Sequence, residues 1–427
     1  MSAPTRLRPT AIALLTLLGL AACGTRPPAA TATSSAPAAL PAAPEPVSAA
    51  TPPLQRQPLA ADLVEMAYSA RQRALFVAAP DWEDENRSQV LRLDPATLAV
   101  QARIPLQGKG LGVALDDAAG RLYLTQGFNG AIAVVDTVAN RVIQRIPVME
   151  KVNFAQAYAE RGLSEQRRAF LLEQLGKFKV SDDYPYKIRE MVVDTRHHRL
   201  FAPGLGLGFD SVLFVIDTRT LTLEQVLPGF GYNAVGIALD ADGGRVFVSN
   251  MQGQIITVDA GTLAITATHE VEADQLLNLA YDPQGRRLFG VDQGIDRDAW
   301  RNNHLERAYA HRSAGHRVFV FDADSGRTLA NLPTGEVPIG LAFDAQAQRL
   351  YVANRGGVRV EQGHGTLSAY DTQHYAWLQT LALPPHPNSV VLEQPGRGVF
   401  VTVKNDGAGK KAGQPESVVR IEGPWPR

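Results

Sequence analysis

The chain has 427 residues, of which 45% are hydrophobic and 20% are charged, so it has enough apolar surface for a large core and is not a disordered protein. Lys and Arg number 42 against 43 Asp and Glu, and this balance gives no case for a dedicated nucleic-acid binder, although a local basic patch stays open. The single cysteine excludes an intramolecular disulfide, a cysteine-based metal cluster and attachment of a c-type haem.

The first 22 residues have the pattern of a secretory signal peptide. Two arginines precede an apolar run over residues 11–22, which is too short to span a bilayer. The run ends in Leu20-Ala-Ala-Cys23-Gly24, which resembles a bacterial lipobox; the resemblance implies cleavage before Cys23 and a diacylglycerol on its thiol. Two or more acyl chains hold a protein stably on a membrane. The alternative is an ordinary signal peptide with an incidental cysteine.

Residues 23–59 are predicted to form a tether. Pro, Ala, Ser and Thr dominate this stretch, and it shows no apolar periodicity. A polyproline-like chain of this length would reach about 100 Å, at about 3.1 Å per residue. The globular part is therefore expected over residues 60–427, held off a membrane surface.

One pattern recurs seven times after residue 60. In one copy, the apolar strand Gly112–Asp116 is followed by a turn, the strand Arg121–Tyr123, a third strand ending at Asp136 and a closing strand at Arg141–Ile143. Each copy thus offers four short strands with alternating polarity, separated by Asp, Gly or Asn turns. One such sheet cannot bury both of its faces, whereas radial packing of several sheets buries them. The sequence predicts an all-β fold, a seven-bladed β-propeller.

The ends of the repeat carry two further expectations. The last copy has no fourth strand after Ile421, so Leu59–Leu63 is predicted to supply it and to close the ring. The Asp residues that end strands are expected to form Asx turns rather than metal or catalytic sites. The basic residue before each second strand is expected to lie exposed in a turn.

Two groups of segments resemble known propellers. Tyr351-Val-Ala-Asn354 and Phe247-Val-Ser-Asn250 resemble the tetrapeptide of the YVTN-type propellers. The closer resemblance is to the periplasmic YncE-like proteins, through Glu65–Ser69, Arg92–Leu98, Gly236–Asp240 and His386–Ser389. It covers nearly everything after residue 60 and implies secretion and a seven-bladed propeller, with no agreed enzymatic motif; nucleic-acid binding has been proposed within that family. This chain differs in its lipobox, its longer tether and its larger loops.

The long loops are predicted to share one face of the propeller. Extra residues follow the second strand in several copies, and a further insertion, Glu150–Lys187, lies between the second and third copies. Loops at these two points emerge on the same side, here called the long-loop face, whereas the opposite tight-turn face keeps short turns. Binding residues concentrate on loops that a rigid scaffold holds. The long-loop face is therefore the predicted functional face.

Two insertions have features of their own. Within Glu150–Lys187, Ser164 is a plausible N-cap and Gly176 a stop signal, which predicts a helix that acts either as a lid over the channel mouth or as a brace. Asp296–His316 carries four arginines, a tryptophan and the three histidines His304, His311 and His316. These histidines could bind zinc or copper, and the Arg and Trp content also suits stacking on bases or anionic sugars. A solvated amphipathic segment is the simpler interpretation.

Small polar and basic residues at the rim of the long-loop face are the candidate ligand-binding residues. They are Gln126, Lys187, Arg189, Asn233, Asn250, Asn278, Asn354, His386, Asn388 and Lys404. The alternative for each asparagine is that it ends a strand and caps a turn.

The sequence contains no serine nucleophile elbow, no paired catalytic carboxylates at a defined spacing and no kinase or Walker motif. We therefore predict a lipid-anchored, monomeric binding propeller in the periplasm or on the cell surface, with the outer membrane favoured. Its ligand is expected to be anionic or sugar-like, and neither a cofactor nor a metal is expected. The alternatives are a metal-assisted lyase or lactonase and a nucleic-acid-binding propeller.

Overall fold

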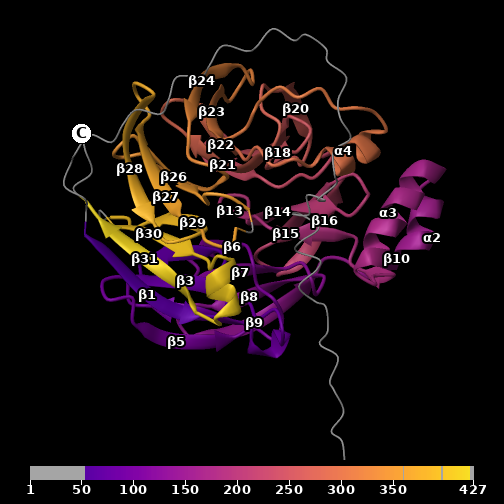
Figure 1. The fold of residues 1–427 in the computed structure, drawn as a ribbon. Helices are drawn as coiled ribbons and strands as arrows, with labels where there is room; N and C mark the ends of the chain where they lie inside the picture. The colour runs from indigo at the N-terminus through magenta and orange to yellow at the C-terminus, as the bar shows by residue number, and fades with distance from the viewer. Residues whose placement is uncertain (1–52, 359, 396–397, 424–427) are drawn as a thin grey trace, which may run out of the picture.

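The fold is a ring of seven β-sheets around a centre (Figure 1). The structure is a computed structural model and describes residues 53–358, 360–395 and 398–423. The predicted signal peptide, Cys23 and the tether as far as residue 52 lie outside the described residues. The prediction of an all-β, seven-bladed propeller is confirmed.

The blades are numbered in chain order, and in each one four antiparallel strands run from the centre of the ring to its outer edge. Blade 1 consists of β2 (Met66–Ser69), β3 (Ala74–Ala79), β4 (Gln89–Leu93) and β5 (Val100–Pro105), and blade 2 consists of β6 (Val113–Asp116), β7 (Arg121–Gln126), β8 (Ala131–Asp136) and β9 (Arg141–Pro147). Blade 3 consists of β13 (Val192–Asp194), β14 (Arg199–Gly206), β15 (Val212–Asp217) and β16 (Thr222–Leu227), and β12 (Tyr186–Ile188) also pairs with β14. Blades 4 and 5 consist of β17 (Ile237–Asp240), β18 (Arg245–Asn250), β19 (Gln254–Asp259) and β20 (Ile265–Glu270); and β21 (Leu276–Asp282), β22 (Arg287–Asp292), β23 (Arg317–Asp322) and β24 (Thr328–Pro333). Blades 6 and 7 consist of β25 (Pro338–Asp344), β26 (Arg349–Asn354), β27 (Gly365–Asp371) and β28 (Ala376–Leu383); and β29 (Pro387–Leu392), β30 (Gly398–Val403), β31 (Glu416–Glu422) and β1 (Leu54–Ala60).

The burial of the strands follows their radial position. The second and third strands are almost entirely buried, as in β3 and β8, because they are sandwiched between neighbouring blades. The outermost strands alternate or are exposed, as in β9. The pairing of third and fourth strands is interrupted by a bulge in blades 1 to 6, for example between Val134 and Val135 in blade 2. Such bulges increase strand twist, which suits sheets that must pack radially.

The ring is closed by its two ends, but not by the segment that the sequence indicated. The predicted pairing of the two ends is confirmed, since β1 pairs with β31 and Leu54 lies opposite Ile421; the closing strand, however, begins at Leu54 and shares only Leu59 and Ala60 with the predicted segment, so the propeller begins before residue 60. The sequence hid this strand because it is an outer one, mostly exposed and polar. Leu63 instead lies in the core, and its N–H donates to the Glu416 carboxylate at 2.6 Å.

The tight-turn face confirms the role of the Asp residues and corrects that of the basic residues. Asp116 Oδ1 accepts the Ala119 N–H at 2.9 Å, and the same Asx-turn contact recurs at most strand ends. Four of the arginines that begin second strands are not free in turns, because each of these reaches the next blade. Their inter-blade contacts run from Arg121 to Thr218 O (2.5 Å), from Arg199 to Ala260 O (2.6 Å), from Arg245 to Asp324 (2.7 Å) and from Arg287 to Thr372 O (2.6 Å).

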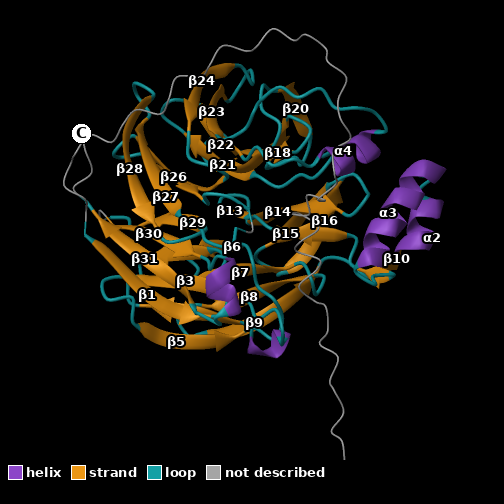
Figure 2. Cartoon of the chain, in the orientation of Figure 1, coloured by secondary structure: helices purple, strands orange, loops and turns teal. Residues whose placement is uncertain are grey.

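The long-loop face carries the short helices (Figure 2). They are η1 (Glu85–Arg87), α2 (Phe154–Glu160), α3 (Glu165–Lys177), α4 (Asp298–Leu305) and α5 (Gly407–Lys411), with the small pair β10 (Val152–Asn153) and β11 (Asp182–Asp183) beside α2. The predicted N-cap is confirmed, since Ser164 Oγ accepts the Arg167 N–H at 3.3 Å. No helix in the described part of the chain is long and apolar enough to cross a membrane.

The helical insertion is a brace and not a lid. Helices α2 and α3 lie at the outer edge of blade 3, away from the centre of the ring (Figure 1). Tyr158 donates to Leu207 O at 2.8 Å, and Arg167 donates to Gly208 O at 2.7 Å, so the helices are tied to the loop after β14. Leu171 and Leu175 bury the apolar side of α3 in the same cluster. The prediction that this segment covers the channel mouth is therefore wrong.

Candidate functional site

The seven first strands form the innermost ring, in which each strand contacts the next. Residues at their long-loop ends therefore face the axis of the propeller. Glu65 precedes β2, and Arg189 and Glu190 precede β13, while Arg355 follows β26 and Arg297 lies in the loop after β22. Five of the seven blades contribute to this group, which we call the central cluster: Glu65, Arg189, Glu190, Arg297, Arg355, His386 and Asn388.

A hydrogen-bonded chain crosses three blades of the central cluster. Arg355 Nη2 donates to Asn388 Oδ1 at 2.6 Å, and Asn388 Nδ2 donates to Glu65 Oε1 at 3.5 Å and to Val64 O at 3.3 Å. The amide of Asn388 thus links a guanidinium of blade 6 to a carboxylate of blade 1. This arrangement fixes the direction of both charged side chains.

The blade 3 part of the cluster is set by backbone packing. A Cβ on Gly112 would lie 1.7 Å from the Arg189 carbonyl oxygen, so only glycine lets blade 2 approach this closely. Arg189 Nε lies 3.7 Å from Glu190 Oε1, which is an ion pair beyond hydrogen-bond distance. The two side chains are 21% and 20% exposed, so they are enclosed but still in contact with solvent.

Three guanidinium groups of the cluster repel one another. The pKa of Arg355 is lowered to about 10, chiefly by burial and also by the charges of Arg189 and Arg297, whereas Glu416 and Glu65 oppose the shift. Burial also lowers the pKa of Arg297 to about 10, and Arg189 and Arg301 act in the same direction. Arg297 and Arg355 therefore remain charged at neutral pH, and the convergence of the three guanidinium groups concentrates positive charge at the centre of the face.

Burial in the same cluster also shifts the pKa of the Glu190 carboxyl group. Burial raises its pKa to about 8, and the Glu65 carboxylate adds to the increase, while Arg189 opposes it. At neutral pH Glu190 is therefore mainly protonated. A protonated Glu190 carries no charge, so it does not offset the positive charge of the arginines.

Several buried polar atoms of this region have no hydrogen-bond partner among the described residues. They are Nε of Arg297, Nε of Arg355, Oε1 of Glu190 and Oδ1 of Asn278. A buried polar group left without a partner costs about 1–3 kcal/mol, and more if it is charged. A ligand that supplied such partners would recover part of this free energy.

The structure brings together three of the ten predicted site residues, Arg189, His386 and Asn388. His386 is buried, and burial followed by the Arg355 charge lowers its pKa. Asn278 lies near the start of the innermost strand β21. Asn233 has a left-handed backbone, with φ of 50°, and its amide contacts Met251 Sδ at 3.9 Å. Whether any of these residues binds a ligand stays a prediction.

The other five predicted site residues make internal contacts that hold the loops. Their contacts are Gln126 with Leu106 O (3.4 Å), Lys187 with Asp183 (2.9 Å), Asn250 with Phe230 O (3.1 Å), Asn354 with Thr366 Oγ1 (3.1 Å) and Lys404 with Leu63 O (2.5 Å). Lys187 also lies over the ring of Phe128, 4.7 Å from its centroid.

Sequence reasoning missed Glu65, Glu190 and Arg355, and it named Arg297 only as part of a basic loop. The available signal was position, because Arg355 directly follows Tyr351-Val-Ala-Asn354 and Glu190 directly follows a predicted site residue. Their convergence depends on the radial order of the blades and was not visible along the chain.

The three histidines of Asp296–His316 do not come together. His304 accepts a hydrogen bond from Arg167 at 2.9 Å and contacts Asp210 at 2.7 Å, which joins α4 to α3 and to blade 3. His311 lies between Asp298 and Asp274, and His316 Nδ1 accepts the Val337 N–H. Among the described residues no three or more His, Cys, Asp or Glu side chains are grouped to hold a metal ion.

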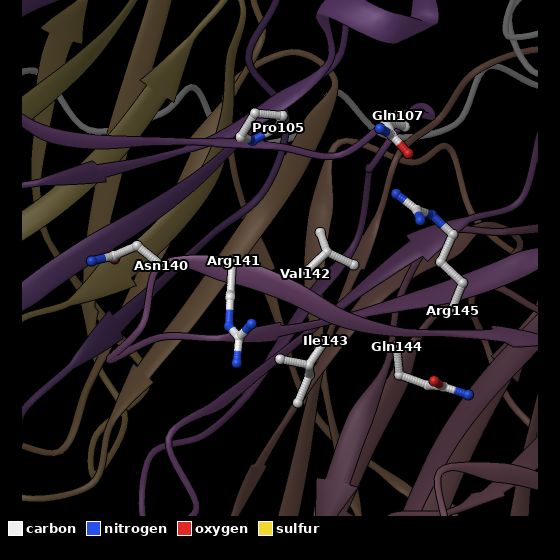
Figure 3. A pocket seen from close by; sticks show the side chains of 8 residues that line it. All are labelled: Pro105, Gln107, Asn140, Arg141, Val142, Ile143, Gln144 and Arg145. Atoms are coloured by element: carbon white, nitrogen blue, oxygen red, sulfur yellow. The ribbon is translucent and has the colours of Figure 1, made fainter.

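A separate groove lies at the outer edge of blades 1 and 2. Its volume is about 510 Å³, and Figure 3 shows the residues of β5 and β9 that line it, with Gln107 and Asn140 beside them. Arg145 from this groove donates to Leu106 O at 2.5 Å. The groove belongs to the outer strands and shares no residue with the central cluster.

Comparison with known proteins places the chain among propellers. No protein-family model matches it. It is 25% identical over 363 residues to the uncharacterized protein YncE of Salmonella typhimurium strain LT2, and 25% identical over 359 residues to YncE of Escherichia coli strain K12. Both alignments cover 84% of this chain and 87% of the relative. Among solved structures, Kuenenia stuttgartiensis hydrazine synthase superposes with a TM-score of 0.58 over 86% of this chain and 98% of that one; at 14% identity, this likeness concerns the fold alone.

Proposed function

We propose that this YncE-like seven-bladed β-propeller is a binding protein, lipid-anchored in the periplasm, whose anionic ligand meets the central cluster of the long-loop face. The observation that carries the proposal is the convergence of Arg189, Arg297 and Arg355 from three blades, where the buried Nε atoms of Arg297 and Arg355 have no hydrogen-bond partner among the described residues. Like charges are held together at a cost in stability, which favours a role in binding an opposite charge.

The chemistry of the cluster favours a compact oxyanion. A guanidinium offers a planar fork of N–H donors that matches carboxylate, sulfate and phosphate oxygens. Of the two nearby carboxyl groups, Glu65 is already hydrogen-bonded by Asn388, and Glu190 is mainly protonated at neutral pH. Glu416, which also acts on Arg355, is itself paired with Lys404 at 3.6 Å, so the three guanidinium groups remain short of negative charge that an anion would supply.

A second candidate function is catalysis, and one observation favours it. Glu190 keeps a proton near neutral pH beside Glu65, and such a pair could supply a general acid and a base. The histidines on which a metal-assisted lyase or lactonase would draw are separated in the fold, which favours binding over this alternative. Nucleic-acid binding would need a basic surface that extends well beyond three central arginines.

Isothermal titration with sodium sulfate tests the proposal, with the ionic strength held constant. Arg355→Ala is expected to weaken sulfate binding about tenfold or more, because a charge-assisted hydrogen bond contributes about 1.5–3 kcal/mol. Arg317→Ala is the matched control, since Arg317 begins β23 on the same face and its side chain donates to Asn331 in an exposed pair at 3.0 Å. Equal weakening by both variants, or no sulfate binding by the wild type, would contradict the proposal.

The anchor is tested by cell fractionation. Cys23 is the sole cysteine and follows directly on a short apolar run, so Cys23→Ser is expected to move the protein from the membrane to the soluble fraction. A wild-type protein that is already soluble in cells would overturn lipid attachment.

A further inference from the structure

Glu190 is the least well partnered charged group of the central cluster. Its Oε1 atom is buried without a hydrogen-bond partner among the described residues, and Arg189 Nε forms an ion pair with it at 3.7 Å. The Glu65 carboxylate, in the loop before β2 of blade 1, raises the pKa of Glu190 further. The ionised form of Glu190 thus depends on one cation, and that cation also lies in the field of Arg297 and Arg355.

An anion that binds Arg189 would remove the stabilisation on which ionised Glu190 depends. The bound anion would neutralise the guanidinium and would itself repel the carboxylate. Both effects favour the protonated carboxyl group, which carries no charge and can donate a hydrogen bond to an anionic oxygen. By linkage, a ligand that promotes protonation binds more tightly where the proton is already present.

We propose that the central cluster takes up its anion together with a proton, and that Glu190 is the group that receives the proton. This inference rests on the proposed function and adds a regulator to it. The ligand class is an oxyanion that binds in its unprotonated form, such as a sulfate or a carboxylate, while Glu190 carries the proton. The direction follows from charge alone: affinity is highest where Glu190 is protonated and falls as the pH rises and the group ionises.

The pKa of Glu190 lies in a pH range in which the other ionisable groups with shifted pKa values near the cluster keep their charge. Burial raises the pKa of Glu190 to about 8, whereas the pKa values of Arg297 and Arg355 are about 10, so both arginines stay charged up to pH 9. Burial and Arg355 lower the pKa of His386, which is therefore neutral above pH 7. Asp62, beside Glu416 and Lys404, has its pKa raised to about 6 and titrates below the window. Of the groups with these shifted pKa values, Glu190 is the one whose charge changes between pH 7 and pH 9.

Titration calorimetry with sodium sulfate, in two buffers of different ionisation enthalpy, tests the coupling because sulfate does not titrate in this range. For the wild type we expect proton uptake at pH 8 and a Kd that rises about tenfold between pH 7 and pH 9. Glu190→Gln should bind with the pH 7 affinity at both pH values and take up no proton. Glu272→Gln, an exposed carboxyl on the same face, is the matched control and should behave as the wild type.

A second variant tests the coupling with Glu190 left in place, in case Glu190→Gln does not fold. Glu65→Gln removes the carboxylate that raises the pKa of Glu190, so the midpoint of the Kd against pH curve should move to lower pH. Sulfate binding without proton uptake, or a pH dependence that survives in Glu190→Gln, would overturn the coupling and leave anion binding intact. Absence of sulfate binding at pH 6–7 would overturn the proposed function itself.

Discussion

The arginines of the tight-turn face and those of the central cluster are the same residue type in opposite situations. On the tight-turn face, Arg287 is bound to Asp282, to Thr372 O and to Tyr375, and its side chain is 11% exposed. In the central cluster, Arg297 and Arg355 are likewise partly buried, yet each keeps a buried Nε that has no hydrogen-bond partner in the described part of the chain and lies in the field of two other arginines. Partners of opposite charge indicate a structural role, and their shortage indicates a site for an external partner.

The tight-turn arginines act between blades. Arg121, Arg199, Arg245 and Arg287 each reach from the start of a second strand to the next blade in the ring. Four successive junctions are therefore tied by charged side chains at the level where the turns are shortest. On the long-loop face, Lys404 ties blade 7 to blade 1 in a similar way, whereas Arg297 and Arg355 keep donor groups that remain available for binding.

The largest effect is expected from breaking one of these junctions. Arg287→Ala would leave Asp282, which is fully buried, without its cation at 2.5 Å, and loss of one member of a buried pair costs about 3–5 kcal/mol. Urea unfolding should register this loss. Arg219→Ala, whose side chain is 67% exposed, is the control and should change the unfolding free energy by less than about 1 kcal/mol. Equal effects of the two variants would contradict the contrast between structural and binding arginines.

The second largest effect concerns Lys404, which the sequence assigned to the ligand. Its Nζ donates to Leu63 O at 2.5 Å and lies 3.6 Å from Glu416, where blades 7 and 1 meet. Lys404→Met is therefore expected to reduce the unfolding free energy by about 1–3 kcal/mol and to leave sulfate affinity unchanged. Lys410→Met, an exposed lysine of the same loop, is the control. A stable Lys404→Met protein with weakened sulfate binding would restore the ligand role.

A third effect depends on pH. Glu190 has a folded pKa of about 8 against an ordinary value of 4.5, so the folded state holds the proton more strongly and the wild type loses stability as the pH rises between these values. Glu190→Gln removes this loss. Its thermal midpoint should exceed that of the wild type at pH 9 and approach it at pH 5. A constant difference across this range would show that Glu190 does not titrate there.

The smallest effect is expected at the brace. Ser164 caps α3 and also donates to Glu306 at 2.6 Å, and loss of an N-cap costs about 1 kcal/mol. Ser164→Ala should speed amide hydrogen exchange in the first turn of α3 and leave sulfate binding unchanged, because α3 lies at the rim. Ser181→Ala, in the loop after α3, is the control. Weakened sulfate binding in Ser164→Ala would indicate that the insertion reaches the centre after all.

The fold could be predicted from the sequence because its signals are local. The period of the strands, the Asp residues that end them and the Ser164 cap all act over a few residues and repeat. The closing strand Leu54–Ala60 was placed too late because an exposed outer strand has no apolar pattern. The candidate site was only partly predictable, since Glu65, Glu190 and Arg355 are more than a hundred residues apart and meet only through the order of the blades.

The central claim is that an oxyanion binds between Arg189, Arg297 and Arg355. A crystal structure of the protein with sodium selenate, measured at the selenium absorption edge, tests it most directly. The account predicts an anomalous peak on the propeller axis at the long-loop face, with guanidinium nitrogens of at least two of these arginines within hydrogen-bond distance of the selenate oxygens. Selenate found only in the outer groove between β5 and β9, or only on the tight-turn face, would contradict it.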